Sequence, residues 1–155
     1  MNLLKPSRPA IKLSCFAILA GLCNLTATAI AHSGATGIVK DRMEMFSQSK
    51  ANMKAIRGHL AAGDLQAVTP LALHIRNWAE KMPDYFPEGS AGSPSEAAPA
   101  IWADFAGFRA AAMASYAAAD DLASASRAGD AEATVAAFKA TAASCKSCHK
   151  TYRLD

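Results

Sequence analysis

Five residues near the C-terminus, Cys145-Lys146-Ser147-Cys148-His149, have the types and the spacing to hold an iron cofactor. Two thiols three positions apart can add to the two vinyl groups on one edge of a porphyrin, and the following imidazole can supply an axial nitrogen to its iron. Cys-x-x-Cys-His is the attachment sequence of c-type haem. A bare Cys-x-x-Cys would also suit a redox dithiol or half of a zinc site, and the added histidine favours haem. We therefore expect one covalent haem c, held by Cys145 and Cys148, with His149 as axial iron ligand.

The first 31 residues have the features of a secretory signal peptide. Lys5, Arg8 and Lys12 give a positive start without acidic residues, and an apolar stretch follows over residues 13–25. Small residues close the segment, so we expect cleavage after Ala31, with Ala29 as the competing site. The apolar run is short of the roughly 20 residues that a membrane span needs. The sequence predicts a periplasmic protein that has no membrane anchor after processing.

Removal of this leader changes the bulk properties of the chain. The leader holds three of the 16 basic residues and none of the 13 acidic ones, so 13 of each remain and the net charge of +3 disappears. A neutral mature chain gives no argument for a nucleic acid as partner. Of the four cysteines, only Cys145 and Cys148 stay in the mature chain. Residues 32–155 are enough for one domain with one modest core.

The mature chain is rich in alanine and poor in aromatic and β-branched residues, which favours helix over strand. Apolar residues recur at three- and four-residue steps in four stretches. They predict helices over about 37–60, 64–82, 100–128 and 130–152. The second helix either begins after Asp64 or has Thr69 as its cap and Pro70 at its first position. The intervening segment 83–99 is rich in proline, glycine and serine and is predicted to lack regular structure.

Short connections within the first and second helix pairs predict an antiparallel, up-down-up-down four-helix bundle of the all-α class. Cys145 and His149 lie four residues apart and share one face of the last helix with Phe138 and Ala142. We therefore expect the haem to lie between helices, held by the last helix and covered by the first. Alanine side chains would leave room for the ring, and base composition explains them equally well.

Four segments, in this order and spacing, resemble the class II cytochromes c, the cytochrome c′ family. They are residues 37–43 (GIVKDRM), 85–90 (YFPEGS), 99–102 (PAIW) and 144–153 (SCKSCHKTYR). The resemblance implies a four-helix bundle with one covalent haem c, often a homodimer, in the periplasm. It also implies that Arg42 and Arg153 lie near the haem, with Arg42 placed for a propionate, which a guanidinium can bind through two hydrogen bonds. The alternative for both arginines is a surface charge.

The resemblance leaves the other face of the iron open. In one group of the family, a methionine four residues after the arginine that matches Arg42 binds the iron, and the protein is a six-coordinate electron carrier. In the other group an apolar residue fills that place, and the five-coordinate iron binds nitric oxide or carbon monoxide. Phe46 stands at this position here, which favours the second form. A register shift of one residue would bring Met45 to the iron, and Met43 is the other nearby candidate.

Other side chains have weaker functional interpretations. His32, His59 and His74 could each bind haem, but a surface or boundary position explains each of them. Lys146 and Lys150 flank the expected haem edge, where they could attract an acidic redox partner or be ordinary solvated charges.

Two kinds of function follow, and they are compatible. One is a one-electron carrier that works with a redox partner protein, and the other is a protein that binds NO or CO. No carboxylate pair or nucleophile–base pattern accompanies the haem motif, so we do not expect an enzyme. A dithiol oxidoreductase using Cys145 and Cys148 is less favoured, because no strand is predicted before the pair. A homodimer would use the outer faces of the first two helices, where Lys50, Lys54 and Arg57 are expected to weaken an apolar interface.

Overall fold

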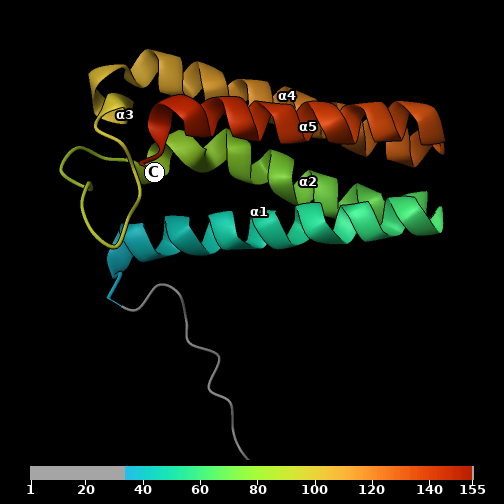
Figure 1. Ribbon diagram of the computed structural model, residues 1–155, viewed down its shortest axis with the longest axis horizontal. Coiled ribbons are helices and arrows are strands. Elements are labelled where there is room, and N and C mark those ends of the chain that lie inside the picture. Colours follow the sequence, from blue (N-terminus) through green and yellow to red (C-terminus); the bar gives the residue numbers. More distant parts are fainter. Residues whose placement is uncertain (1–33, 155) are drawn as a thin grey trace, which may run out of the picture.

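Four long helices form the part of the chain described by this computed structural model, residues 34–154 (Figure 1). Their bounds are α1 Gly37–Ala62, α2 Leu65–Lys81, α4 Phe105–Ala128 and α5 Ala131–Tyr152. A 3₁₀ helix, η1 (Met82–Tyr85), and a single helical turn, α3 (Ala100–Ala103), lie between α2 and α4. Tight turns link α1 to α2 and α4 to α5, so that the helices of each pair run antiparallel. The prediction of an all-α four-helix bundle is confirmed.

Aspartates begin three of these helices, and glycines end two of them. The side chains of Asp64, Asp104 and Asp130 each accept a hydrogen bond from the backbone N–H three residues further on, at 3.2, 2.9 and 2.9 Å. Each cap satisfies one of the N–H groups that a helix start leaves unpaired. Gly63 and Gly129 end α1 and α4 in the left-handed conformation, with φ of 72° and 73°, which favours glycine. Asp104 is the one boundary among these five that the sequence pattern did not indicate.

Two predictions about the middle of the chain are wrong. The expected single helix over 100–128 is broken, because Asp104 leaves the helical conformation to cap α4 and so separates it from α3. The segment 83–99, expected to lack regular structure, begins with most of η1, which continues directly from α2.

The start of α2 is settled between the two alternatives. The helix begins after Asp64, and the Thr69 hydroxyl instead shares a hydrogen bond of 2.8 Å with that of Ser126 on α4. Pro70 therefore lies inside α2, where it lacks the N–H that would bond four residues back. Val68, on the same helix, is fully buried in the core. Burial of this apolar face offsets the missing hydrogen bond.

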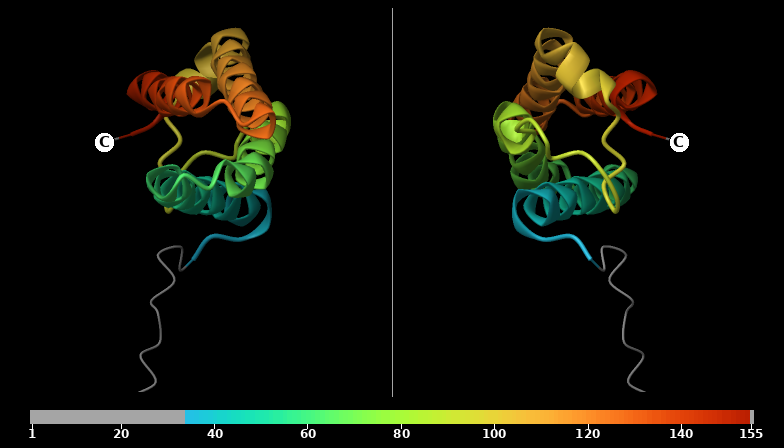
Figure 2. Two further views of the ribbon diagram at one scale, coloured as in Figure 1. Left: turned by 90° about the vertical axis from the view of Figure 1, so that its right-hand side faces the viewer. Right: turned by 90° about the vertical axis from the view of Figure 1, so that its left-hand side faces the viewer.

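The four helices pack in chain order and leave one seam open. α1 packs on α2, α2 on α4 and α4 on α5, whereas α1 and α5 make no comparable contact. Viewed along the helices, α1 and α5 face each other across the middle of the molecule (Figure 2). The apolar side chains form two clusters, one around Ile56, Val68 and Ile75 and one, mostly aromatic, around Trp78, Phe86 and Phe108.

The segment between η1 and α3, which we call the connecting segment (residues 86–99), pairs with the C-terminus. Ala98 donates its N–H to the Tyr152 carbonyl at 3.0 Å, and Leu154 donates its N–H to the Glu96 carbonyl at 2.8 Å. These hydrogen bonds hold the end of α5 against the connecting segment. They matter for function because α5 carries the Cys-x-x-Cys-His motif.

Among the described residues, no helix is both long enough and apolar enough to cross a membrane. The expected signal peptide, its cleavage sites at Ala29 and Ala31, and His32 lie outside the described residues. The predictions for them therefore stay predictions.

Candidate functional site

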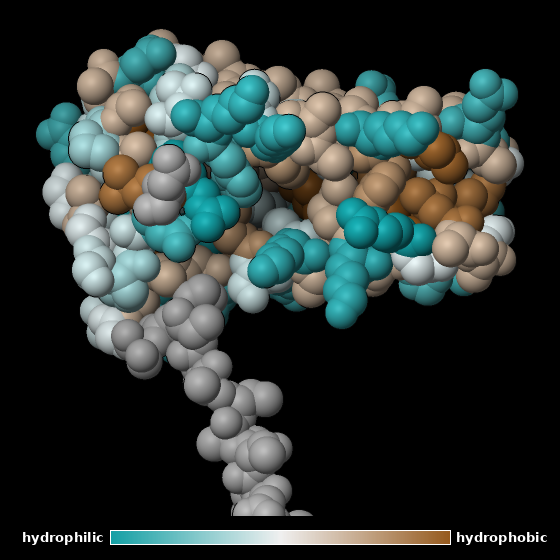
Figure 3. Space-filling view, viewed as in Figure 1, coloured by the Kyte–Doolittle hydropathy of each residue, from teal (hydrophilic) through white to brown (hydrophobic). Residues whose placement is uncertain are grey.

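The open seam between α1 and α5 is a cavity of about 1220 Å³. The space-filling view shows an apolar strip along this seam with hydrophilic side chains above and below it (Figure 3). Side chains of α1, α2, α4 and α5 line the cavity, together with residues of the connecting segment. An apolar cavity of this size in a small bundle is suited to a large, flat, apolar group.

The attachment motif lies on one wall of this cavity. Cys145, Cys148 and His149 all line it from the last turns of α5. Both cysteines are free thiols and partly buried, so each is available for a thioether bond to a porphyrin. Burial, and after it the positive charge of Arg153, lowers the pKa of His149. A lowered pKa favours the neutral imidazole, which is the form that binds iron.

The same surroundings disfavour a reactive dithiol. Burial raises the pKa of Cys145, and burial together with the neighbouring Cys145 raises the pKa of Cys148 to about 11. A dithiol that attacks disulfides needs the opposite, a pKa lowered toward neutrality so that thiolate is present. Residues 34–154 also contain no strand, so the βαβ setting of such an enzyme is missing from this part of the chain.

Two arginines tie α1 and the end of α5 to the same part of the connecting segment. Arg42 donates a hydrogen bond to the Ser95 hydroxyl at 2.8 Å, and Arg153 Nε lies 2.7 Å from Glu96 Oε2 in an ion pair. Ser95 and Glu96 are neighbours in the connecting segment, so it links the two helices at this end of the cavity.

Phe46 and the attachment motif meet at the same part of the cavity. Phe46 lines it from α1 and His149 lines it from α5. Phe46 and Cys148 both pack against the aromatic cluster around Trp78, Phe86 and Phe108. The Phe46 ring packs edge-on against Trp78, with 5.3 Å between the ring centroids.

The methionines of α1 lie elsewhere. Met43 lines the cavity, but it is only one residue in from Arg42. Met45 is not among the cavity-lining residues and packs against the aromatic cluster. Met53 lines the cavity eleven residues in, which is about 17 Å along the helix from Arg42. Among these side chains of α1, Phe46 is the one that both lines the cavity and packs against the same aromatic cluster as Cys148.

Arg42 is almost completely buried, at 1 % exposure. The alternative of a surface charge is therefore wrong for this arginine. Its guanidinium donates hydrogen bonds to the Tyr85 carbonyl at 3.1 Å, to both oxygens of Ser90 and to the Ser95 hydroxyl. It also lies over the Phe86 ring, 4.4 Å from the centroid. Arg42 thus fastens the connecting segment to α1, a role that the sequence did not indicate.

The charge of Arg42 lacks a protein counterion. No carboxylate in residues 34–154 lies within ion-pair distance of it, and burial lowers its pKa. A buried charge without an opposite charge is strongly unfavourable. Because Arg42 also lines the cavity, the residues present fit a ligand that brings its own anionic groups, as the propionates of haem would. Arg153, by contrast, is half exposed and paired with Glu96.

Three cavity-lining aromatic residues were not identified as site residues from the sequence. Trp78, Phe86 and Phe108 lie on the cavity wall, and their pattern indicated only a general core. Trp78 is 2 % exposed, and its indole N–H has no hydrogen-bond partner among the described residues. Apolar residues at helical spacing look alike in a sequence whether they face another helix or a cofactor, so no signal distinguishes them.

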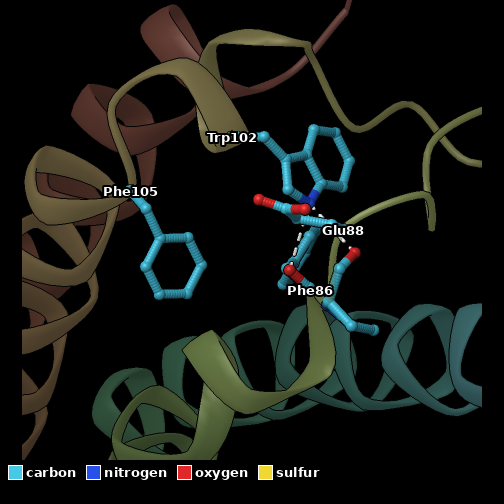
Figure 4. Close-up of a pocket in the computed structure, with 5 residues that line it drawn as sticks. Phe86, Glu88, Trp102 and Phe105 are labelled. Carbon is cyan, nitrogen blue, oxygen red and sulfur yellow. Dashed lines mark hydrogen bonds between the residues drawn. The ribbon is translucent and has the colours of Figure 1, made fainter.

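A second and smaller opening lies beside the connecting segment (Figure 4). It measures about 300 Å³ and is lined by Phe86, Pro87, Glu88, Trp102 and Phe105. The indole N–H of Trp102 donates to the carbonyls of Phe86 and Pro87 at 3.1 and 3.0 Å, which fixes one wall. None of the attachment residues borders this opening, and it is much smaller than the cavity between α1 and α5.

The other two histidines in the described part of the chain, His59 and His74, lie outside the cavity. His59 Nδ1 lies 3.4 Å from Asp64 Oδ2 at the end of α1, and His74 has a buried Nδ1 without a partner among the described residues. Neither residue lines the cavity.

Several basic residues lie at the border of the cavity. Lys146 and Lys150 are exposed and line the cavity, as expected from their place beside the motif. Lys50, Lys54 and Arg57 line it as well. These three side chains are also exposed, and their expected effect on a dimer interface stays a prediction.

These features define a class of protein: an antiparallel helical bundle whose open seam, thiol pair and imidazole suit one covalently attached haem. The match to known proteins is equally specific. The chain belongs to the cytochrome c′ family, whose model, described as Cytochrome C′, matches residues 37–153. Cytochrome c′ of Rhodospirillum rubrum is 38 % identical over 143 residues, which cover 89 % of this chain and 97 % of that one. The chain is accordingly a c-type cytochrome with covalent haem c.

Solved structures agree with this assignment. One is a cytochrome c′ described as showing ligand-controlled dimer dissociation, with a TM-score of 0.71, 26 % identity and coverage of 76 % of this chain and 95 % of that one. Another is the nitric oxide complex of a variant cytochrome c prime from Alcaligenes xylosoxidans, with a TM-score of 0.69, 26 % identity and coverage of 76 % and 94 %.

Proposed function

We propose that the protein is a periplasmic one-electron carrier whose haem iron is five-coordinate and takes up NO or CO. Haem c, when bound, supplies the Fe(III)/Fe(II) couple and the free coordination position. Cys145 and Cys148 would hold the ring by thioether bonds, and His149 would supply one axial nitrogen. The observation that carries the proposal is that Phe46, which cannot bind iron, lines the cavity from α1 at the aromatic cluster that Cys148 also contacts, while His149 lines it from α5.

Phe46 would act by excluding anions and water from the iron. Its ring is held in place by edge-on packing against Trp78 at 5.3 Å and Phe86 at 6.4 Å. An anion or a water molecule beside these rings would lose hydrogen bonds to solvent without gaining partners. A small, neutral diatomic molecule has no such penalty. The nitric oxide complex of the Alcaligenes xylosoxidans protein supports this choice of ligand.

Absorption spectra of the matured protein test the proposal directly. We expect a high-spin ferrous spectrum that shifts when carbon monoxide is added. A low-spin ferrous spectrum that carbon monoxide does not change would contradict the proposal and indicate a sixth ligand from the protein.

Three variants identify the residue responsible. Phe46→Met should place a thioether opposite His149 and convert the iron to a low-spin form that no longer binds carbon monoxide. Met43→Leu and Met45→Leu are the matched controls and should leave the wild-type spectrum unchanged. If either control turns a low-spin wild-type iron high-spin, the protein is the second candidate, a six-coordinate electron carrier. The position of Met43 favours this second candidate, because Met43 is a methionine of α1 that lines the cavity.

Export and assembly complete the proposal. The mature chain would begin at His32 as one domain over residues 32–155, so its mass should equal that chain plus one haem. A homodimer is supported by the cytochrome c′ described with ligand-controlled dimer dissociation, and sedimentation with and without carbon monoxide tests it. We propose that the protein acts as a haem-binding carrier and not as an enzyme, which its membership of the cytochrome c′ family supports.

A further inference from the structure

Two rows of positive charge border the mouth of the cavity. Lys50, Lys54 and Arg57 form one row on α1, and the other row lies on α5. It consists of Lys146, Lys150 and Arg153, and all six side chains are exposed and line the cavity. In both rows the spacing is four residues and then three, which keeps the three cations on one face of their helix. Figure 3 shows hydrophilic side chains on both sides of the apolar strip.

This concentration does not reflect the composition of the chain. The described residues 34–154 hold 13 Lys and Arg against 12 Asp and Glu. Seven of these basic residues line the cavity, the six of the rows and the buried Arg42, whereas Glu96 is the only acidic residue that does. Glu96 pairs with Arg153 at 2.7 Å. The other five cations of the rows have no carboxylate within ion-pair distance in this part of the chain.

Within each row the like charges, three and four residues apart, repel each other. Of the six cations, only Arg153 has an ion pair in the described residues that offsets this repulsion, with Glu96. The two propionates of haem would neutralise only part of this charge, and Arg42 already offers them a buried partner. An excess of positive charge therefore remains at the mouth when haem is bound.

We propose that the two rows form the docking surface for an acidic redox protein, whose carboxylates would lie along both sides of the haem groove. This inference rests on the proposed electron-transfer function. Along α1, the basic residues that line the cavity extend from Arg42 to Arg57, fifteen residues or about 22 Å. That length suits a standard protein interface of about 800 Å² on each partner.

The geometry favours a protein over other anionic or apolar surfaces. A second copy of this chain would present the same positive rows and be repelled. A flat membrane surface would touch the two sides of the groove without reaching the strip between them. A protruding acidic surface can fill the groove, and attraction between opposite charges would bring its redox centre to the haem edge and speed the encounter.

Stopped-flow electron transfer tests the proposal on the haem-loaded protein. The probe is a reduced plant-type [2Fe–2S] ferredoxin, an acidic protein, from which one electron passes to the ferric iron while no bond forms or breaks and no proton moves. The test variant is Lys50→Gln/Lys54→Gln/Lys146→Gln. The matched control is Lys81→Gln/Arg127→Gln/Lys139→Gln, which removes as many exposed cations that neither line the cavity nor form ion pairs in the described residues.

We expect the test variant to lower the second-order rate constant at low salt by roughly tenfold and to flatten its salt dependence. The control variant should stay within about twofold of the wild type, because its cations lie away from the groove. Photoreduced lumiflavin, a neutral reductant, should reduce all three proteins at the same rate.

The outcomes separate this inference from the function on which it rests. If lumiflavin cannot reduce the haem of the wild type, the electron-transfer function itself fails. If lumiflavin reduces it but the test and control variants react with ferredoxin alike, the docking surface is refuted and the function stands. A third outcome would assign the rows to a membrane surface and overturn the proposal. In that case the test and control variants react with ferredoxin alike, and the wild type but not the test variant co-sediments with phosphatidylserine vesicles.

Discussion

Replacement of Arg42 tests whether this buried arginine organises the connecting segment. The guanidinium bonds to Tyr85, Ser90 and Ser95 and has no protein counterion in the described residues. In Arg42→Met the side chain keeps a flexible apolar stem but is shorter and loses every donor. We expect the connecting segment to detach from α1 much more often in this variant than in the wild type.

The magnitude follows from the hydrogen bonds. A hydrogen bond to a charged group contributes about 1.5–3 kcal/mol, and the bonds of one guanidinium are not additive. The variant no longer has to desolvate a buried charge, and this gain offsets part of the lost hydrogen-bond energy. We therefore expect its free energy of unfolding to be lower by about 3 kcal/mol. Opening of the connecting segment then rises by about 100-fold, since 1.4 kcal/mol is a factor of ten. Arg42→Lys keeps the charge but not the planar fork and should lose about half as much.

Two assays report on this change. Urea unfolding followed by circular dichroism gives the free energy of unfolding, and digestion with a glutamate-specific protease reports the opening at Glu88, which is exposed in the connecting segment. Arg127→Met is the control, because Arg127 is an exposed arginine of α4. A loss below about 1 kcal/mol in Arg42→Met, with cleavage at Glu88 unchanged, would refute the role of Arg42 as the fastener of this segment.

Two further predictions concern α4 and the thiols. In Gly107→Ala, the new methyl group would overlap the Asp104 carboxylate and the Tyr152 hydroxyl, so loss of this cap should cost about 1–2 kcal/mol and lower Tm by roughly 5 °C. Gly58→Ala, where nothing lies within 4 Å, should be neutral or stabilising, and equal Tm values for the two variants would contradict this account. In haem-free protein, a Cys148 pKa of about 11 keeps the thiol protonated near neutrality. The rate of alkylation by iodoacetamide should then rise about tenfold for each pH unit between pH 8 and 10. A rate that levels off above pH 8 would show that the pKa is not raised.

Much of the fold could be predicted because its signals are local. The apolar periodicity of each helix, the glycines that end α1 and α4, and the aspartates that begin α2 and α5 are set by neighbouring residues. Asp104 was not predicted to be a helix boundary, because the apolar pattern runs across it without interruption. Its cap on the Gly107 N–H is local, but the hydroxyl of Tyr152 that also bonds to its carboxylate comes near only in the fold.

The chemistry of the site divides in the same way. The sequence alone determined the covalent attachment of haem, because two thiols and an imidazole within five residues of one helix need no partner from elsewhere in the chain. Which side chains surround that haem was decided by the tertiary structure. The burial of Arg42 depends on the connecting segment that covers it. The placement of Phe46 and His149 on one cavity, and of the two positively charged rows at its mouth, depends on how α1 lies relative to α5. These helices are separated by most of the chain and are related through the connecting segment, so no spacing along the sequence encodes their register.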